Sequence, residues 1–157
     1  MAIVQAVNRR TLMLSGASAA AVLALLPHAA SAQAPTDAQA LEAAIKKAVG
    51  EAKPTDGRIT LTLPEIAENG NTVPFDFAVQ SPMTEADHVK AVHIFAPGNP
   101  QPEVASFAFS PASGKATVTS RMRLAKTQDI VALAEMSDGK VFMTKRTVKV
   151  TIGGCGG

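Results

Sequence analysis

The chain contains no tryptophan, no tyrosine and only one cysteine among its 157 residues. Six phenylalanines are its only aromatic side chains, so it lacks the aromatic platform on which proteins stack bases or sugars. A single cysteine excludes an internal disulfide framework. No apolar run approaches the roughly 20 residues that a membrane-spanning helix needs, and we therefore expect no membrane anchor.

The charge balance excludes a further class of partners. The formal net charge of the whole chain is +2, but the only basic residues in the first 32 positions are Arg9 and Arg10. Without these two, 13 basic residues face 13 acidic ones. Binding to nucleic acid or to an anionic membrane is favoured by a basic excess, and we expect neither partner.

The first 32 residues have the three parts of an export signal. A pair of arginines precedes an uncharged stretch rich in alanine and leucine, which a small-residue cleavage motif follows. The pair favours the twin-arginine (Tat) pathway, so we predict a periplasmic protein whose signal peptide spans 1–32. These features are carried by Arg9 and Arg10 in the pair and by Ala30 and Ala32 in the cleavage motif.

Residues 33–57 are predicted to form a lead-in and one helix. Thr36 and Gln39 are spaced as a capping box, and Gly50 is placed to end the helix. A single apolar stripe at helical spacing indicates that the helix lies against a larger layer. The stripe consists of Leu41, Ala44, Ile45 and Ala48.

Residues 58–152 are predicted to form an all-β domain. Apolar residues here recur with a period of two, and turn residues separate the apolar segments. Seven short strands in about 95 residues favour an immunoglobulin-like antiparallel β-sandwich, with a hairpin at Asp138-Gly139. The expected strands are 59–63, 73–79, 89–96, 104–109, 116–124, 130–136 and 141–152.

The chain ends with its only cysteine between two pairs of glycines, Gly153-Gly154-Cys155-Gly156-Gly157. Glycine buries no side chain and has the highest backbone entropy, so we predict a flexible C-terminal arm over 153–157. Such an arm lets the sulfur reach about 10 Å beyond the last folded residue. No general base is evident beside the thiol, and we predict no catalytic residue: Cys155 is an attachment point on which other proteins act.

Two other groups of residues are candidate binding sites. His88 and His93 are five positions apart and would lie on opposite faces of a strand, so we expect no metal site and no cofactor. Four basic residues precede the arm and form either a solvated strand face or a positive rim near Cys155. They are Lys140, Lys145, Arg146 and Lys149, with Lys145 and Lys149 expected on one face and Arg146 on the other.

The chain resembles the SoxY family in its layout, and most closely over residues 134–157, which include Val148 to Ile152 and the glycine-flanked cysteine. The resemblance implies a sulfur-carrier subunit of a periplasmic system that oxidises thiosulfate. It also implies that sulfur intermediates are held covalently on Cys155, as adducts rather than as a cofactor. The carrier arm is then formed by Gly153, Gly154, Gly156 and Gly157.

The same resemblance implies several partners. The family member pairs with SoxZ as a heterodimer, and its arm visits a c-type cytochrome complex (SoxAX), a hydrolase (SoxB) and, in some organisms, a sulfane dehydrogenase (SoxCD). It implies a carrier, not an enzyme.

Two alternatives remain open at this point. The chain could be a periplasmic immunoglobulin-like interaction subunit whose terminal cysteine only crosslinks two chains. It could also be a ubiquitin-like sulfur donor carrying a thiocarboxylate on Gly157, although such donors act in the cytoplasm and the export signal argues against one.

Overall fold

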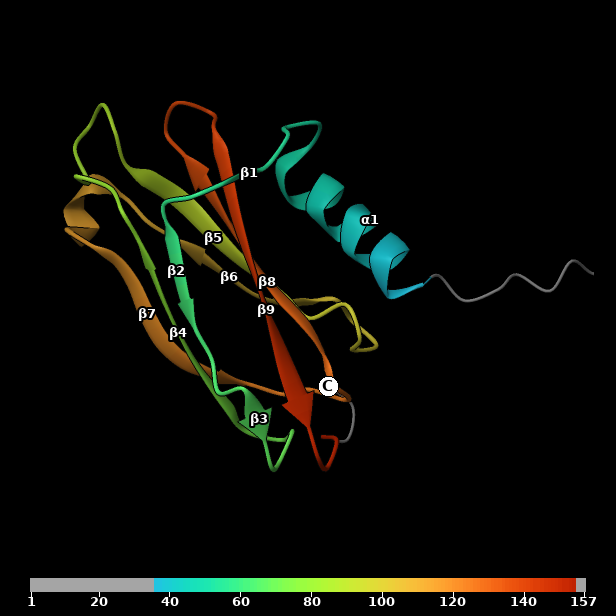
Figure 1. The fold of residues 1–157 in the computed structure, drawn as a ribbon. Coiled ribbons are helices and arrows are strands. Elements are labelled where there is room, and N and C mark those ends of the chain that lie inside the picture. The colour runs from blue at the N-terminus through green and yellow to red at the C-terminus, as the bar shows by residue number, and fades with distance from the viewer. Residues whose placement is uncertain (1–35, 155–157) are drawn as a thin grey trace, which may run out of the picture. The chain divides into compact units, whose positions relative to one another are not determined.

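The computed structural model describes residues 36–154. Within that range the chain forms one α-helix, nine strands and a short 3-10 turn at Pro111–Ser113. The main elements are α1 (Asp37–Val49), β1 (Thr55–Asp56), β2 (Ile59–Thr62), β3 (Ile66–Ala67), β4 (Val73–Val79), β5 (Val89–Phe95), β6 (Glu103–Ala108), β7 (Ala116–Met122), β8 (Gln128–Met136) and β9 (Val141–Val150). Figure 1 shows α1 lying along one side of the strands.

The helix α1 begins at the predicted capping box. The Thr36 hydroxyl accepts the Gln39 N–H at 3.3 Å, and the Gln39 side chain accepts the Thr36 N–H at 2.9 Å. Gly50 ends the helix with a φ of 66°, and its N–H donates to the Lys46 carbonyl. The predicted apolar stripe packs on the larger sheet, which confirms that the helix lies against a larger layer; its partners there are Phe95, Val131, Leu133 and Val141.

The strands form two sheets in the described part of the chain. The larger sheet has the order β1-β9-β8-β5-β6 with β3 also paired to β9, and the smaller sheet has the order β2-β4-β7. All pairs are antiparallel except those of β1 and β3 with β9, which are parallel. The predicted all-β sandwich with one N-terminal helix is confirmed. The larger sheet begins at Thr55, three residues before the predicted start, because a two-residue strand shows no alternation from which to predict it.

The burial of each strand follows from what covers its two faces. In β4 every second residue is buried and the others face outward, because only one face of the smaller sheet meets the core. In β8 both faces are covered: Ile130 and Ala132 pack between the two sheets, while Val131 and Leu133 pack under α1. This explains the nearly continuous apolar run at 130–136.

The hairpin between β8 and β9 is confirmed at Asp138-Gly139. The Gly139 N–H donates to the Met136 carbonyl, and the Met136 N–H donates to the Lys140 carbonyl at 2.9 Å. Gly139 has a φ of 82°, which a residue without a Cβ adopts at little cost. The hairpin sets the register of β9 and so carries the chain to its C-terminal segment.

Candidate functional site

The predicted site lies at the C-terminal end, and the structure describes only part of it. Gly153 and Gly154 are within residues 36–154, and their surroundings can be stated. The remaining predicted site residues lie outside the described residues: Arg9, Arg10, Ala30, Ala32, Cys155, Gly156 and Gly157.

The end of β9 is held on both sides before the glycines begin. The Val150 N–H donates to the Thr127 hydroxyl at 2.9 Å, and the Thr151 N–H donates to the Ala67 carbonyl at 3.0 Å. The Thr151 hydroxyl donates to the same carbonyl at 3.2 Å. The backbone is therefore fixed as far as residue 151, one residue beyond the last strand.

Gly153 and Gly154 are also held, so the prediction of a flexible arm over 153–157 is corrected for these two glycines. The Gly154 N–H donates to the Leu124 carbonyl at 2.9 Å, and Gly154 is buried. Gly153 lies so close to the Ala125 carbonyl oxygen that a Cβ would collide with it. The composition of the tail indicated freedom, but a residue without a side chain can also let two backbones approach closely, and this is its use here.

Gly70 is a residue of this site that the sequence did not reveal. It lies in the loop between β3 and β4, and its N–H donates to the Ile152 carbonyl at 2.8 Å. The segment Glu68 to Asn71 reads only as a turn, and many turns contain glycine for conformational reasons. Gly70 does not have a positive φ, and nothing in the sequence indicates the close approach that requires it.

Two exposed isoleucines belong to the segments that meet here. Ile66 in β3 is 59% exposed and Ile152 is 69% exposed, and they are the only large exposed apolar residues in the described range. Ile66 pairs with Lys149 at the end of β9, and Ile152 directly precedes the glycines. Single exposed apolar residues are ordinary, but Ile152 adds apolar surface directly before the two described glycines.

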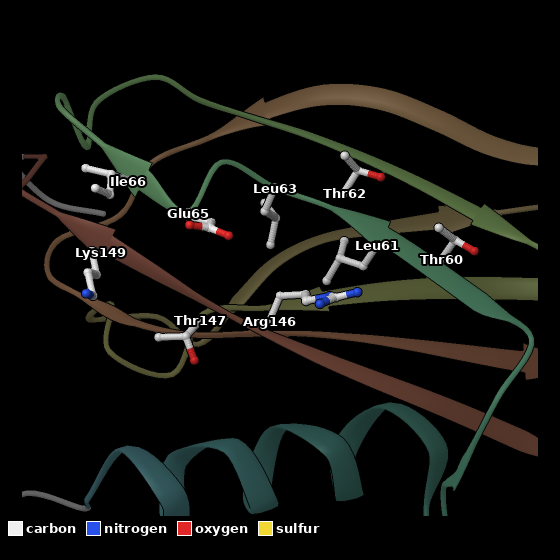
Figure 2. Close-up of a pocket in the computed structure, with 9 residues that line it drawn as sticks. All are labelled: Thr60, Leu61, Thr62, Leu63, Glu65, Ile66, Arg146, Thr147 and Lys149. Carbon is white, nitrogen blue, oxygen red and sulfur yellow. The ribbon is translucent and has the colours of Figure 1, made fainter.

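A groove of about 540 Å³ runs between β2 and β9. On this edge β9 pairs with β1 at Phe142 and Met143 and with β3 at Lys149 and Val150, and between these pairs the groove opens. Figure 2 shows the Arg146 side chain lying between β2 and β9. The residues that line the groove are Thr60, Leu61, Thr62, Leu63, Glu65, Ile66, Arg146, Thr147 and Lys149.

The four basic residues before the arm are divided between different surroundings. Lys145 pairs with Asp129 at 3.0 Å and Lys140 pairs with Asp138 at 2.7 Å. Hydrogen bonds from the Thr147 hydroxyl and from Lys145 hold the pKa of Asp129 below its ordinary value. Arg146 and Lys149, predicted on opposite faces, line the same groove. The groove lies at the edge of the sheet, where side chains from both faces can reach it.

The two histidines have separate polar partners. His88 Nδ1 lies 3.0 Å from the Thr84 carbonyl, and His93 Nδ1 lies 2.7 Å from the Ser106 hydroxyl. Within residues 36–154 no three histidine, cysteine or carboxylate side chains gather as a metal site would require. The helix in this range is also too short and too polar to cross a membrane.

The family model described as sulfur oxidation protein SoxY matches residues 45–155. No curated protein matches the chain.

The chain is also similar to several solved structures. The structure of the sulfur carrier protein SoxY from Chlorobium limicola f thiosulfatophilum is 38% identical with a TM-score of 0.63, and the match covers 73% of this chain and 99% of that one. A superoxide reductase (neelaredoxin) from Ignicoccus hospitalis is 20% identical with a TM-score of 0.52, covering 73% of this chain and 93% of that one. At this identity, the second match shows a shared fold alone.

Proposed function

Since the chain belongs to the SoxY family, we propose that it carries sulfur covalently on Cys155 and presents it to partner enzymes. Family membership supports a carrier role in sulfur oxidation. The observation that carries the finer proposal is the extent of the family match, which runs from residue 45 to Cys155 itself. The position of the thiol therefore lies within the stretch that the family model matches.

Covalent attachment suits the chemistry of a reactive sulfur intermediate. An intermediate bonded to Cys155 cannot diffuse away, and docking of each partner gives it a high effective concentration at the partner's active site. A carrier needs no base of its own, because the partner supplies the catalytic groups and redox centres. The chain thus acts as a substrate-bearing subunit and not as an enzyme.

The proposed loading step forms one sulfur–sulfur bond. The Cys155 thiolate and the terminal sulfur of thiosulfate join to give a cysteine S-thiosulfonate, and the two electrons released pass to the haem groups of a c-type cytochrome complex. In the next step, water cleaves the bond between the middle sulfur and the sulfone group. The hydroxyl group of water leaves with the sulfone as sulfate, and the other proton of water goes to the cysteine persulfide that remains. These steps require an oxidant and a hydrolase, and both are partners in the proposal.

The proposed partners follow the family. They are SoxZ as the heterodimer partner, the cytochrome SoxAX for loading, the hydrolase SoxB for release of sulfate and the sulfane dehydrogenase SoxCD for oxidation of the remaining sulfur. The periplasm is the proposed compartment, reached by the twin-arginine pathway, because the first 32 residues have the pattern of an export signal.

Intact mass spectrometry of the native protein tests this function. Protein from cells oxidising thiosulfate is expected to carry thiosulfonate or persulfide adducts on Cys155 that a reductant removes, and Cys155→Ser is expected to lose both the adducts and thiosulfate oxidation while keeping its fold. Unmodified Cys155 under these conditions would refute the proposal. A covalent dimer on a non-reducing gel, without sulfur adducts, would favour the crosslinking alternative, and extra sulfur on Gly157 would favour the ubiquitin-like one.

A further inference from the structure

Three segments far apart in the sequence meet in a closed ring of backbone hydrogen bonds. The Gly70 N–H donates to the Ile152 carbonyl at 2.8 Å, the Leu124 N–H donates to the Gly70 carbonyl at 2.7 Å, and the Gly154 N–H donates to the Leu124 carbonyl at 2.9 Å. Each segment donates to one neighbour and accepts from the other. We call these residues, together with Ala125 and Gly153, the arm junction.

The arm junction has no room for side chains at its three glycines. A Cβ on Gly70 would collide with the Leu124 carbonyl oxygen and lie 2.6 Å from the Gly154 nitrogen. A Cβ on Gly154 would lie 2.8 Å from the Gly70 carbonyl oxygen. All three glycines have φ values that other residues adopt, so it is space and not backbone conformation that requires glycine here.

Two buried amides hold the middle segment of the junction in place. Asn99 and Gln128 are the buried polar side chains of the described range. The Asn99 side chain donates to the Arg123 carbonyl at 2.9 Å and accepts the Ala125 N–H at 3.0 Å, so it fixes the backbone on both sides of Leu124. Gln128 in turn donates to Asn99 Oδ1 at 2.9 Å. The Leu124 side chain is fully buried, so the segment is fixed from the core outward.

We propose that Gly70 is a positioning residue for the sulfur-bearing cysteine, with Asn99 acting through the Leu124 segment. The proposal rests on the carrier function proposed above and specifies how the cysteine is presented. The junction fixes the backbone at Gly154, one residue before Cys155. One further residue places the Cys155 sulfur within about 7 Å of the Gly154 Cα.

A short reach determines how a partner must approach. An enzyme that acts on this sulfur has to bring its active site to the surface around the junction, where Ile152 is exposed on the segment that leads to the glycines. Docking, more than swinging of a long arm, then sets the position of the cargo. If the junction were broken, a longer segment before Cys155 would be flexible. Each docking event would then have to order this segment again, at an entropic cost.

Amide hydrogen exchange of the wild-type carrier, in complex with its partner subunit, tests the junction itself. The Gly154 amide is expected to exchange about 100-fold or more slowly than the Gly156 amide, because a hydrogen bond that opens only by local unfolding protects it. Equal exchange rates at Gly154 and Gly156 would overturn the proposal. This measurement needs no variant and depends on no assumption about sulfur chemistry.

Gly70→Ala tests the positioning role, with Gly114→Ala as the matched control. Gly114 has a φ of 68° with no atom near its Cβ position, so its replacement strains the backbone without touching the junction. In Gly70→Ala the Gly154 amide is expected to lose protection, and loading of Cys155 by the partner cytochrome to slow about 10-fold relative to the control. A small soluble disulfide reagent is expected to react with Cys155 at least as fast as in wild type.

The outcomes separate the two proposals. If wild type never acquires sulfur on Cys155 but the Gly154 amide is protected, the carrier function is refuted. The junction is then confirmed as a structural feature, without a role in sulfur transfer. If wild type is loaded and Gly70→Ala is loaded at the control rate despite an unprotected Gly154, the positioning role is refuted. Should Gly70→Ala not fold, Asn99→Leu repeats the test from the other side of the Leu124 segment, with the same expected loss of protection at Gly154.

Discussion

The interface between α1 and the larger sheet and the arm junction are held by different forces. At the interface, Leu41, Ile45 and their neighbours bury apolar side chains against Val131 and Leu133. At the junction, three backbone hydrogen bonds join three segments, and the glycines in two of them leave no room for a side chain. One region is stabilised by what its side chains bury and the other by how closely its backbones approach.

The difference predicts different responses to substitution. An apolar interface tolerates another apolar residue of similar volume at modest cost. The three glycines of the junction have no room for a side chain, since even a methyl group there meets a backbone carbonyl oxygen or amide nitrogen. The following experiments test this contrast.

Leu133→Ala is expected to have the largest effect on stability. Leu133 is fully buried under α1, and its truncation leaves a cavity that costs about 3 kcal/mol of unfolding free energy. Denaturant titration followed by circular dichroism measures this loss. Leu133→Met, which roughly conserves volume, is the control and is expected to cost far less. Equal losses for both variants would show that the interface depends on shape more than on buried volume.

Gly154→Val and Gly156→Val are expected to separate the two halves of the arm. A valine at 154 meets the Gly70 carbonyl and the Asn71 nitrogen, and we expect it to cost about 2 kcal/mol of unfolding free energy. Valine at 156 is expected to change stability by less than about 0.5 kcal/mol. Thermal denaturation of both variants measures the difference. If both leave stability unchanged, the junction does not contribute to the folded state.

Thr36→Ala tests the start of the helix, where a side-chain hydroxyl accepts a backbone N–H. Loss of the hydroxyl that accepts the Gln39 N–H is expected to cost about 1 kcal/mol, detected as a lower denaturation midpoint. Thr36→Ser keeps an accepting hydroxyl and is expected to retain most of the stability. A Ser variant as unstable as the Ala variant would show that the threonine methyl group, and not the cap, is what matters.

The smallest expected effect is a pH dependence from His93. Burial lowers the pKa of His93 below its ordinary value of 6.5, although Glu103 and Glu135 act in the opposite direction. The unfolded chain therefore binds the proton more readily, and the unfolding free energy is expected to fall as the pH drops below about 6.5 through the folded-state pKa. His93→Gln is expected to flatten this slope. The carboxylates with lowered pKa values, Asp129 and Asp138, lose their contribution only below about pH 5. An unchanged slope between about pH 5 and 6.5 in His93→Gln would therefore refute the assignment to His93.

The sequence predicted the elements whose signals are local. The capping box at Thr36, the apolar stripe of α1 and the Asp138-Gly139 turn are all formed as expected. Each depends on residues within a few positions of one another. The strands β1 and β3 could not be predicted, because two residues carry no periodicity and both form only by pairing with β9.

The candidate site divides in the same way. The single thiol at the C-terminal end, the glycines beside it and the resemblance to a family are all read from the sequence. The glycine content of the tail predicted a flexible arm. Composition does not reveal which backbone segments pack against those glycines.

The contacts that hold Gly153 and Gly154 arise only in the folded chain. Their partners, Gly70 and the Leu124-Ala125 segment, lie 84 and about 30 residues away along the chain. No side-chain pattern in the sequence predicts backbone hydrogen bonds between segments so far apart. A buried amide pair, Asn99 and Gln128, completes the arrangement. Contacts made by the backbone become visible only when the fold brings the segments together.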